Sequence, residues 1–207
     1  MPETKIQEIY GAVIPAAGLS SRMKDFKPLL KIGEYGLPER EIRTFSECGV
    51  DLQVVVTGYR GRDLEEGLSK ALPDHNICFV HNPDYASTQM FDSLKLGLEK
   101  LSGKCTRVFI CPADIPLFSA ETVKLLMRTE GRVVIPVSGG EEGHPLLIGA
   151  ELIPAILAHD GTDGLRGALG RAAETVYCEV EDPGCLLDAD TPQDLQKLRL
   201  LALSDKR

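Results

Sequence analysis

Residues 13–31, V-I-P-A-A-G-L-S-S-R-M-K-D-F-K-P-L-L-K, are the part of the chain from which its fold can be inferred most directly. They continue an apolar run, 12–14, that is typical of a buried strand, and small residues follow at 15–21. Small residues let a backbone approach a ligand closely, and Gly18 tolerates conformations that other residues avoid. The cations that follow are Arg22, Lys24, Lys27 and Lys31. A strand, a loop with exposed N–H groups and a cluster of cations together predict a cradle for a polyphosphate.

The same stretch has a second interpretation, in which a strand and a tight turn lead into a solvated basic segment. The loop is not a P-loop, because no Gly-Lys-Ser/Thr closes it, and it does not match G-x-G-x-x-G. Local chemistry alone leaves both interpretations open.

The composition limits the class of protein. With 207 residues, 43% of them hydrophobic, the chain can bury one sizeable core, and we expect one domain over residues 1–207. The net charge of −8 argues against nucleic acid and anionic membranes as partners. The absence of a long apolar segment and of a signal peptide favours a cytoplasmic protein without a membrane partner. No C-x-x-C pair occurs, and cysteines such as Cys78 and Cys111 lie in apolar runs, so we expect reduced core thiols.

Strands and helices are expected to alternate along most of the chain. The expected strands are 12–14, 52–58, 77–80, 107–111, 132–137, 145–148 and 175–180. The expected helices are 38–48, 63–72, one from Ser87 or Thr88 to Leu101, 119–128, 151–159, 165–173 and 192–204. This order predicts an α/β fold with a mostly parallel sheet flanked by helices, and such sheets bind ligands at the carboxyl ends of their strands.

The string A-A-G-x-S-x-R-M-x-x-x-K, residues 16–27, resembles the signature loop of the MobA-like NTP transferase family. It is most similar to the branch of cytidylyltransferases for the molybdenum cofactor, and further motifs occur in the expected order up to residue 195. The resemblance implies a single Rossmann-like, GT-A-like nucleotidyltransferase domain. It also implies that Arg22 and Lys27 are catalytic, because they neutralise the triphosphate. The loop residues implied to bind the nucleotide are Ala16, Ala17, Gly18, Ser20, Arg22 and Lys27.

The segment C-P-A-D-I-P, residues 111–116, places Asp114 at the carboxyl end of an expected strand. A carboxylate there can ligate a hard cation such as Mg²⁺, or it can simply cap a turn beside proline. The segment resembles the D-x-P motif of the family, whose aspartate holds the catalytic metal. The resemblance therefore implies that Asp114 is catalytic and a metal ligand.

A second acidic segment, L-D-A-D-T-P-Q-D-L, covers residues 187–195. Thr191 as N-cap, with Asp194 at the third helical position, predicts the start of a helix. Asp188 and Asp190 are left without a structural role. The family carries a similar D-x-D-T-P-x-D stretch, in which an upstream acid completes the metal site. We favour Asp188 as that metal ligand, because Asp190 can instead interact with the helix dipole.

Three further segments resemble family motifs, and each also has a purely structural interpretation. Gly-His-Pro at 143–145 implies that His144 binds the acceptor, although an imidazole there can also bond the backbone. Asn82 and Ser93 are implied to shape the nucleotide pocket, but an Asn-Pro turn before a helix explains Asn82 nearly as well. Thr57 and Gly58 either approach the base or merely end a strand.

The resemblance implies a Mg²⁺-dependent nucleotidyltransferase. It would transfer CMP from CTP to a small phosphorylated acceptor, with molybdenum-bearing molybdopterin favoured, and would release pyrophosphate. A sugar phosphate or a polyol phosphate is an alternative acceptor. A different class of function is a non-catalytic nucleotide-binding chaperone of a molybdoenzyme, which would make a molybdoenzyme its partner.

Overall fold

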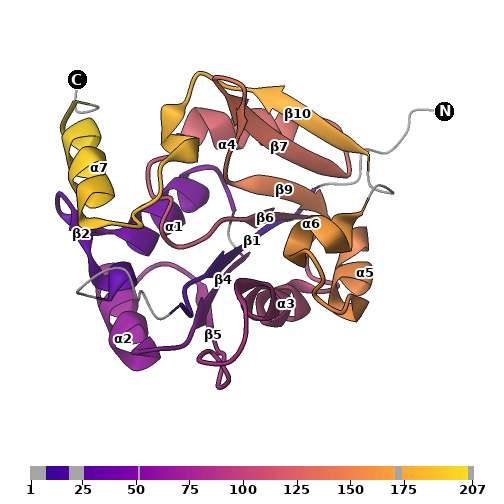
Figure 1. Cartoon of the computed structure of the whole chain (residues 1–207), viewed down its shortest axis with the longest axis horizontal. Coiled ribbons are helices and arrows are strands. Elements are labelled where there is room, and N and C mark those ends of the chain that lie inside the picture. The colour runs from indigo at the N-terminus through magenta and orange to yellow at the C-terminus, as the bar shows by residue number, and fades with distance from the viewer. Residues whose placement is uncertain (1–7, 19–25, 51, 171–173, 205–207) are drawn as a thin grey trace.

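The computed structural model describes residues 8–18, 26–50, 52–170 and 174–204, and these build an α/β fold around one large sheet. The sheet has eight strands in the order β10-β7-β9-β6-β1-β4-β5, with β8 paired to β7 (Figure 1). The strands are β1 (Tyr10–Pro15), β4 (Leu52–Thr57), β5 (Ile77–His81), β6 (Arg107–Ile110), β7 (Val133–Ser138), β8 (Glu141–Glu142), β9 (Leu146–Gly149) and β10 (Thr175–Glu179).

The pairing confirms a mostly parallel sheet. Strands β5, β4, β1 and β6 are parallel neighbours, and β10 is parallel to β7. The exceptions in the main sheet are β9, which is antiparallel to both β6 and β7, and the short β8. The carboxyl ends of the parallel strands therefore meet at one edge.

Helices cover both faces of the sheet. They are α1 (Leu37–Glu47), α2 (Gly61–Ala71), α3 (Met90–Leu101), α4 (Ala120–Arg128), α5 (Ile153–Ala158), α6 (Gly164–Leu169) and α7 (Pro192–Ser204). On β1, Ala12 and Ile14 belong to a core shared with α1, α2 and α4, whereas Val13 belongs to one shared with α3 and α5. This alternation accounts for the continuous apolar run of the strand, since both of its faces are buried. In the part of the chain described, no helix is both long enough and apolar enough to cross a membrane.

Helix α3 lies unusually close to the sheet because of Gly97. A Cβ atom at this position would lie 2.3 Å from Cγ1 of Val13 on β1. The glycine therefore permits a helix–sheet distance that any other residue would prevent. This contact brings the amino end of α3 to the carboxyl end of β1.

Several predicted boundaries are wrong. Helix α3 begins at Met90 rather than at Ser87 or Thr88, because Gln89 is its N-cap and the Gln89 N–H donates to Asp92 Oδ2 at 3.0 Å. Ser87 and Thr88 instead bond the Asp84 carbonyl in the preceding turn.

A small hairpin follows the first loop where no secondary structure was expected. It consists of a 3₁₀ turn, η1 (Lys27–Leu29), and strands β2 (Lys31–Ile32) and β3 (Tyr35–Gly36). A satellite core joins it to α7, which lies beside β2 in Figure 1. In that core Ile32, Leu195 and Leu198 pack with Ala189, which is fully buried. The hairpin and α7 thereby hold the acidic segment 188–190 in place.

The expectation of core thiols holds only for some of the cysteines. All six are free, and Cys111, Cys178 and Cys185 are buried. Cys78 is exposed, because it lies on the edge strand β5. The apolar run around Cys78 does not reveal that its strand has a neighbour on one side only.

Candidate active site

A pocket opens at the carboxyl ends of β1 and β6, the position predicted for a ligand in a parallel sheet. Pro15 ends β1, and residues 112–114 directly follow β6. The lining residues are Pro15, Ala16, Gly18, Lys27, Pro28, Met90, Pro112, Ala113, Asp114 and Asp190. The first loop, the D-x-P motif and the second acidic segment thus meet in one place.

Lys27 is the central charged group of this pocket. Its Nζ donates a hydrogen bond to Asp114 Oδ2 at 3.0 Å and also contacts Asp190 Oδ1. The three side chains are partly exposed, by 13% for Lys27, 25% for Asp114 and 28% for Asp190. Burial lowers the pKa of Lys27, but its bonds to the two carboxylates outweigh that effect and the pKa is raised overall. The lysine is therefore held as a cation at neutral pH.

The backbone around Asp114 is held on two sides. The N–H of Cys111 donates to the Val13 carbonyl at 3.1 Å, and the N–H of Ala113 donates to the Pro15 carbonyl at 3.1 Å. On the other side, the Ala189 N–H donates to the Asp114 carbonyl at 3.0 Å. The loop thus continues the pairing of β6 with β1 while it is joined to the second acidic segment.

The structure distinguishes between the two acids considered for a second metal ligand. Asp190 lines the pocket and contacts Lys27, whereas Asp188 is exposed and does not line it. Burial, and then repulsion by the negative charges of Asp190 and Asp114, raise the pKa of Asp188. The predicted N-cap is confirmed, since Thr191 Oγ1 accepts from the Asp194 N–H at 3.2 Å and the Asp194 carboxylate bonds Thr191 in return.

The first loop is packed tightly against the end of β4. The Ala16 N–H donates to the Val56 carbonyl at 2.8 Å, and Ala16 and Ala17 are both buried. A Cβ atom on Gly58 would lie 2.7 Å from the Ala17 carbonyl oxygen and 2.7 Å from Cβ of Tyr85. Gly58 therefore permits the close approach of the two loops, although it does not itself line the pocket.

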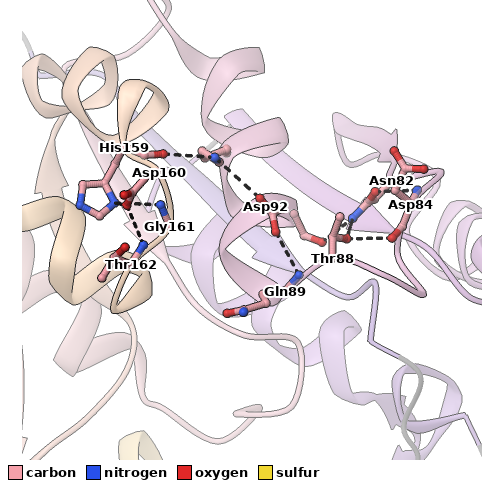
Figure 2. A network of polar contacts seen from close by, with 11 residues as sticks. Asn82, Asp84, Thr88, Gln89, Asp92, His159, Asp160, Gly161 and Thr162 are labelled. Carbon is pink, nitrogen blue, oxygen red and sulfur yellow. Dashed lines mark hydrogen bonds and ion pairs between the residues drawn. The ribbon is translucent and has the colours of Figure 1, made fainter.

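The polar residues predicted beside the nucleotide are bonded within the protein. The Thr57 hydroxyl donates to Glu65 Oε1 at 2.7 Å and is fully buried. Asn82 Nδ2 donates to Thr88 Oγ1 and to Ser93 Oγ, each at 3.0 Å. Figure 2 shows Asn82 joined to Thr88 and Asp84 at the start of α3. These side chains order the loop and the helix start, as the structural interpretation of Asn82 predicted.

Figure 2 also shows how the amino end of α3 is supported from its other side. Lys95 bridges Asp92, at 3.7 Å, to the His159 carbonyl, at 3.4 Å. The segment after α5 is in turn closed by Asp160, which accepts from the Thr162 N–H at 2.9 Å. The helix end that carries Met90 to the pocket is therefore fixed by loops on both sides.

His144 lines a second cavity and not the pocket around Lys27. Its imidazole Nδ1 is buried and makes no hydrogen bond within the part of the chain described. Its backbone N–H donates to the Cys185 carbonyl at 2.8 Å. Burial lowers the pKa of the imidazole, while the Ile110 carbonyl and the charge of Asp114 oppose that shift. The imidazole is therefore neutral at neutral pH. The second cavity is lined by Ile135, Glu142, Gly143, His144, Leu146, Leu165, Arg166, Leu169, Gly170, Thr175 and Tyr177.

Two predicted residues, Ser20 and Arg22, lie outside the described residues. The sequence interpretation missed Met90, an exposed first residue of α3 that lines the pocket. It favoured Asp188 over Asp190 as the second metal ligand, and that choice stays a prediction, although Asp190 is the one that lines the pocket. The capping box could have indicated the position of Asp190. Thr191 and Asp194 already cap the helix, so Asp190 is not needed at the helix end.

The donor set of the pocket fits a hard divalent cation. Asp114 and Asp190 supply carboxylate oxygens, the ligand type that Mg²⁺ prefers. No group of three or more His, Cys, Asp or Glu side chains that would hold a metal occurs among the described residues. Mg²⁺ is commonly held by one or two carboxylates together with substrate phosphates, so a site completed by the nucleotide fits better than a closed protein site.

Comparison with known proteins identifies the family of this chain. Residues 12–176 match the MobA-like NTP transferase domain. The chain belongs to the MobA-like NTP transferase family. It is 28% identical over 184 residues to molybdenum cofactor cytidylyltransferase of Escherichia coli, a match that covers 88% of this chain and 91% of that protein. As a member of this family, the chain is a nucleotidyltransferase.

Solved structures show the same fold. A nucleotidyl transferase from Methanothermobacter thermautotrophicus superposes with a TM-score of 0.81 at 24% identity, covering 97% of this chain and 100% of that one. A Mycobacterium tuberculosis protein in complex with manganese superposes with a TM-score of 0.74 at 17% identity, covering 94% and 99% of the two chains. The manganese ion belongs to that neighbour, whose fold this chain shares.

Proposed function

We propose that this protein transfers CMP from CTP to the terminal phosphate of molybdenum-bearing molybdopterin and releases pyrophosphate. The observation that carries the proposal is the meeting of Lys27, Asp114 and Asp190 at the carboxyl ends of β1 and β6. A cation and two carboxylates in one partly buried pocket suit a metal-bound triphosphate. The similarity to a molybdenum cofactor cytidylyltransferase supports CTP and this acceptor.

The reaction needs positioning and charge stabilisation rather than a strong base. An ionised phosphate oxygen of the acceptor attacks the α-phosphorus of CTP, a new P–O bond forms, and the bond to the bridging oxygen breaks. The electron pair leaves with pyrophosphate. The acceptor phosphate is already ionised at neutral pH, so no residue has to remove a proton from it.

The charged residues have separate tasks in this proposal. Lys27 and Arg22 neutralise the triphosphate, and Lys27 stays in contact with the phosphates as negative charge moves onto the leaving group. Asp114 and Asp190 would hold Mg²⁺, which would supply further neutralisation of the phosphate oxygens. In the nucleotide complex, Lys27 exchanges a carboxylate contact for a phosphate contact.

The acceptor enters from the side of His144. The second cavity combines apolar residues with Tyr177 and the exposed Arg166–Glu142 ion pair, whose atoms are 3.1 Å apart. An apolar cavity with a few polar groups suits a partly planar, polar ring compound better than a small sugar phosphate. The neutral imidazole of His144 donates a hydrogen bond to the acceptor, and the product is passed to a molybdoenzyme.

Pyrophosphate release with four nucleoside triphosphates and a panel of acceptors tests the proposal. The panel contains molybdenum-bearing molybdopterin, a sugar phosphate and a polyol phosphate. We expect efficiency with CTP to exceed that with GTP by about 10²-fold, because unpaired polar groups in a closed site are costly. Equal efficiency with both nucleotides would remove the cytidylyl assignment and leave the reaction class. Tight nucleotide binding without turnover on any acceptor would favour the non-catalytic binding module.

A further inference from the structure

A row of side chains leads from the pocket around Lys27 to the outer edge of the sheet. Tyr177 on β10 pairs with Ile135 on β7, and Leu146 on β9 pairs with Ile110 at the end of β6. Ile135 stands beside Leu146, because the residues next to them on β7 and β9 are paired with each other. The loop after β6 lines the pocket, so the row crosses three strand spacings, roughly 14 Å, between the pocket and the edge strand β10.

The second cavity lies over this row. Its volume is about 630 Å³, against about 210 Å³ for the first pocket. Ile135, Leu146 and Tyr177 line it from the sheet, and Leu165 and Leu169 line it from α6. The two leucines pack with Ile135 and Leu146 in one apolar cluster. The cavity is therefore a slot with apolar walls on two sides, which suits a flat ring system.

Arg166 is the only Lys or Arg side chain among the described residues that line this cavity. It is 85% exposed, and its Nη2 lies 3.1 Å from Oε2 of Glu142, which is 44% exposed. Because water screens both charges, an exposed pair of this kind contributes little to stability. A guanidinium also offers two parallel donors to a carboxylate or a phosphate. An anion that enters the cavity can therefore replace Glu142 as the partner of Arg166 at low cost.

The sequence before Arg166 holds the start of α6 in a tight turn. The Gly164 N–H donates to the Gly161 carbonyl at 2.9 Å, and Gly164 has a φ of +59°, a conformation that favours glycine. A Cβ atom at Gly167 would lie 2.0 Å from the Thr162 carbonyl oxygen, so this position also requires glycine. The turn is thus specified by its glycines, and it sets the position from which Arg166 reaches the cavity.

We propose that the second cavity is the subsite for the ring end of the acceptor, where Arg166 binds an anionic group and Tyr177 stacks on the ring. Arg166 exchanges Glu142 for that group when the acceptor enters. This inference rests on the proposed function and adds two requirements on the acceptor. It carries an anionic group besides the phosphate that reacts, and it reaches from the end of β6 to the edge of the sheet. A small sugar phosphate is too short to meet the second requirement.

Two variants and one matched control test this assignment. Arg166→Gln removes the cation, and Tyr177→Ala removes the ring. Arg132→Gln breaks another exposed pair with the same separation, 3.1 Å to Glu151, at a position that does not line this cavity. The first readout is the affinity for pterin-6-carboxylate, a flat ring with an anionic group and no phosphate, measured by its own fluorescence. The second readout is the KM for molybdenum-bearing molybdopterin and for CTP, measured by pyrophosphate release.

We expect Arg166→Gln to weaken the binding of pterin-6-carboxylate and to raise the KM for the acceptor, each by about tenfold, because a charge-assisted hydrogen bond is lost. Tyr177→Ala should change both quantities by about fivefold, because a stacking contact is lost. The KM for CTP should stay within about twofold of the wild-type value in both variants, since CTP binds in the other pocket. Arg132→Gln should leave all three quantities at their wild-type values.

Other results would overturn the inference. They are a wild-type protein that does not bind pterin-6-carboxylate, unchanged binding in Arg166→Gln, or an equal loss in Arg132→Gln. An equal rise in the KM for CTP in Arg166→Gln would also contradict a role confined to the acceptor. The binding readout needs neither CTP nor turnover. Binding of pterin-6-carboxylate through Arg166, without pyrophosphate release from CTP, would therefore refute the proposed function and still support the subsite.

Discussion

Charged clefts lie at both ends of the central sheet, and they differ in how their charges are satisfied. The cleft at the carboxyl ends holds Lys27 between Asp114 and Asp190, with a volume of about 210 Å³. The cleft at the amino ends of β1 and β6 is larger, about 850 Å³, and contains Arg107. Size alone would select the second cleft.

In the cleft at the amino ends, the arginine is already bonded to backbone carbonyls of the protein. Arg107 is 7% exposed and donates to the carbonyls of Met127, Thr129 and Gly131 at 3.4, 3.1 and 3.2 Å. Its planar guanidinium closes the carboxyl end of α4 and the turn after it. Tyr10 also belongs to this structure, since its hydroxyl donates to the Met127 carbonyl at 3.2 Å, and burial followed by Glu8 raises its pKa to about 12.

In the cleft at the carboxyl ends, Lys27 is paired with two carboxylates instead. An ammonium group between carboxylates exchanges partners readily, whereas a guanidinium bonded to fixed carbonyls does not. The comparison teaches that a binding site is marked by charged side chains whose present ionic partners a bound ion can replace. Five substitutions test this difference.

Asp114→Asn should have the largest effect. It keeps the shape and removes the charge that holds a hard cation, so turnover should fall by about 10³-fold or more while CTP affinity falls modestly. Steady-state pyrophosphate release and CTP titration measure the two quantities. Partial rescue by higher Mg²⁺ or by Mn²⁺ is expected, and normal turnover would return Asp114 to a turn-capping role.

Lys27→Met should follow. Loss of a desolvated contact to phosphate costs about 2–4 kcal/mol of transition-state stabilisation, which corresponds to roughly 30- to 1,000-fold in kcat/KM. The assay is the same pyrophosphate release. Near-native activity would mean that Lys27 is only a structural partner of the two carboxylates and would remove the distinction between the clefts.

Asp190→Asn and Asp188→Asn form a matched pair that decides the second metal ligand. From the pocket geometry we expect Asp190→Asn to raise the Mg²⁺ concentration needed for half-maximal turnover by about 10- to 100-fold, and Asp188→Asn to have a milder effect. A Mg²⁺ titration at saturating CTP compares them. The reverse order of effects would restore Asp188 as the ligand.

Arg107→Met should change activity least. It removes the guanidinium donor from the carbonyls of Met127, Thr129 and Gly131, so the free energy of unfolding should fall by about 1–3 kcal/mol. CTP affinity and turnover of the folded protein should stay at wild-type values, as urea unfolding and the pyrophosphate assay would show. A selective loss of CTP binding would mean that the amino-end cleft also takes part in function.

Local sequence patterns predicted much of the fold. The buried run of β1, the N-cap Ser119 of α4 and the capping box of Thr191 and Asp194 were all readable, because each depends on neighbours within a few residues. The hairpin β2–β3 was missed, because such short strands are stabilised by α7 from the far end of the chain. Cys78 was predicted to be a core thiol but is exposed, because an edge strand resembles a central strand in sequence.

The sequence by itself determined the residue types of the site, the order of its motifs and the carboxyl-end location that an alternating α/β pattern implies. Only the tertiary structure decided that Lys27 meets Asp114 and Asp190 across sequence separations of 87 and 163 residues. It also decided that Asn82 and Ser93 bond each other. Hydrogen bonds and burial depend on distances between segments, and one-dimensional spacing does not contain those distances.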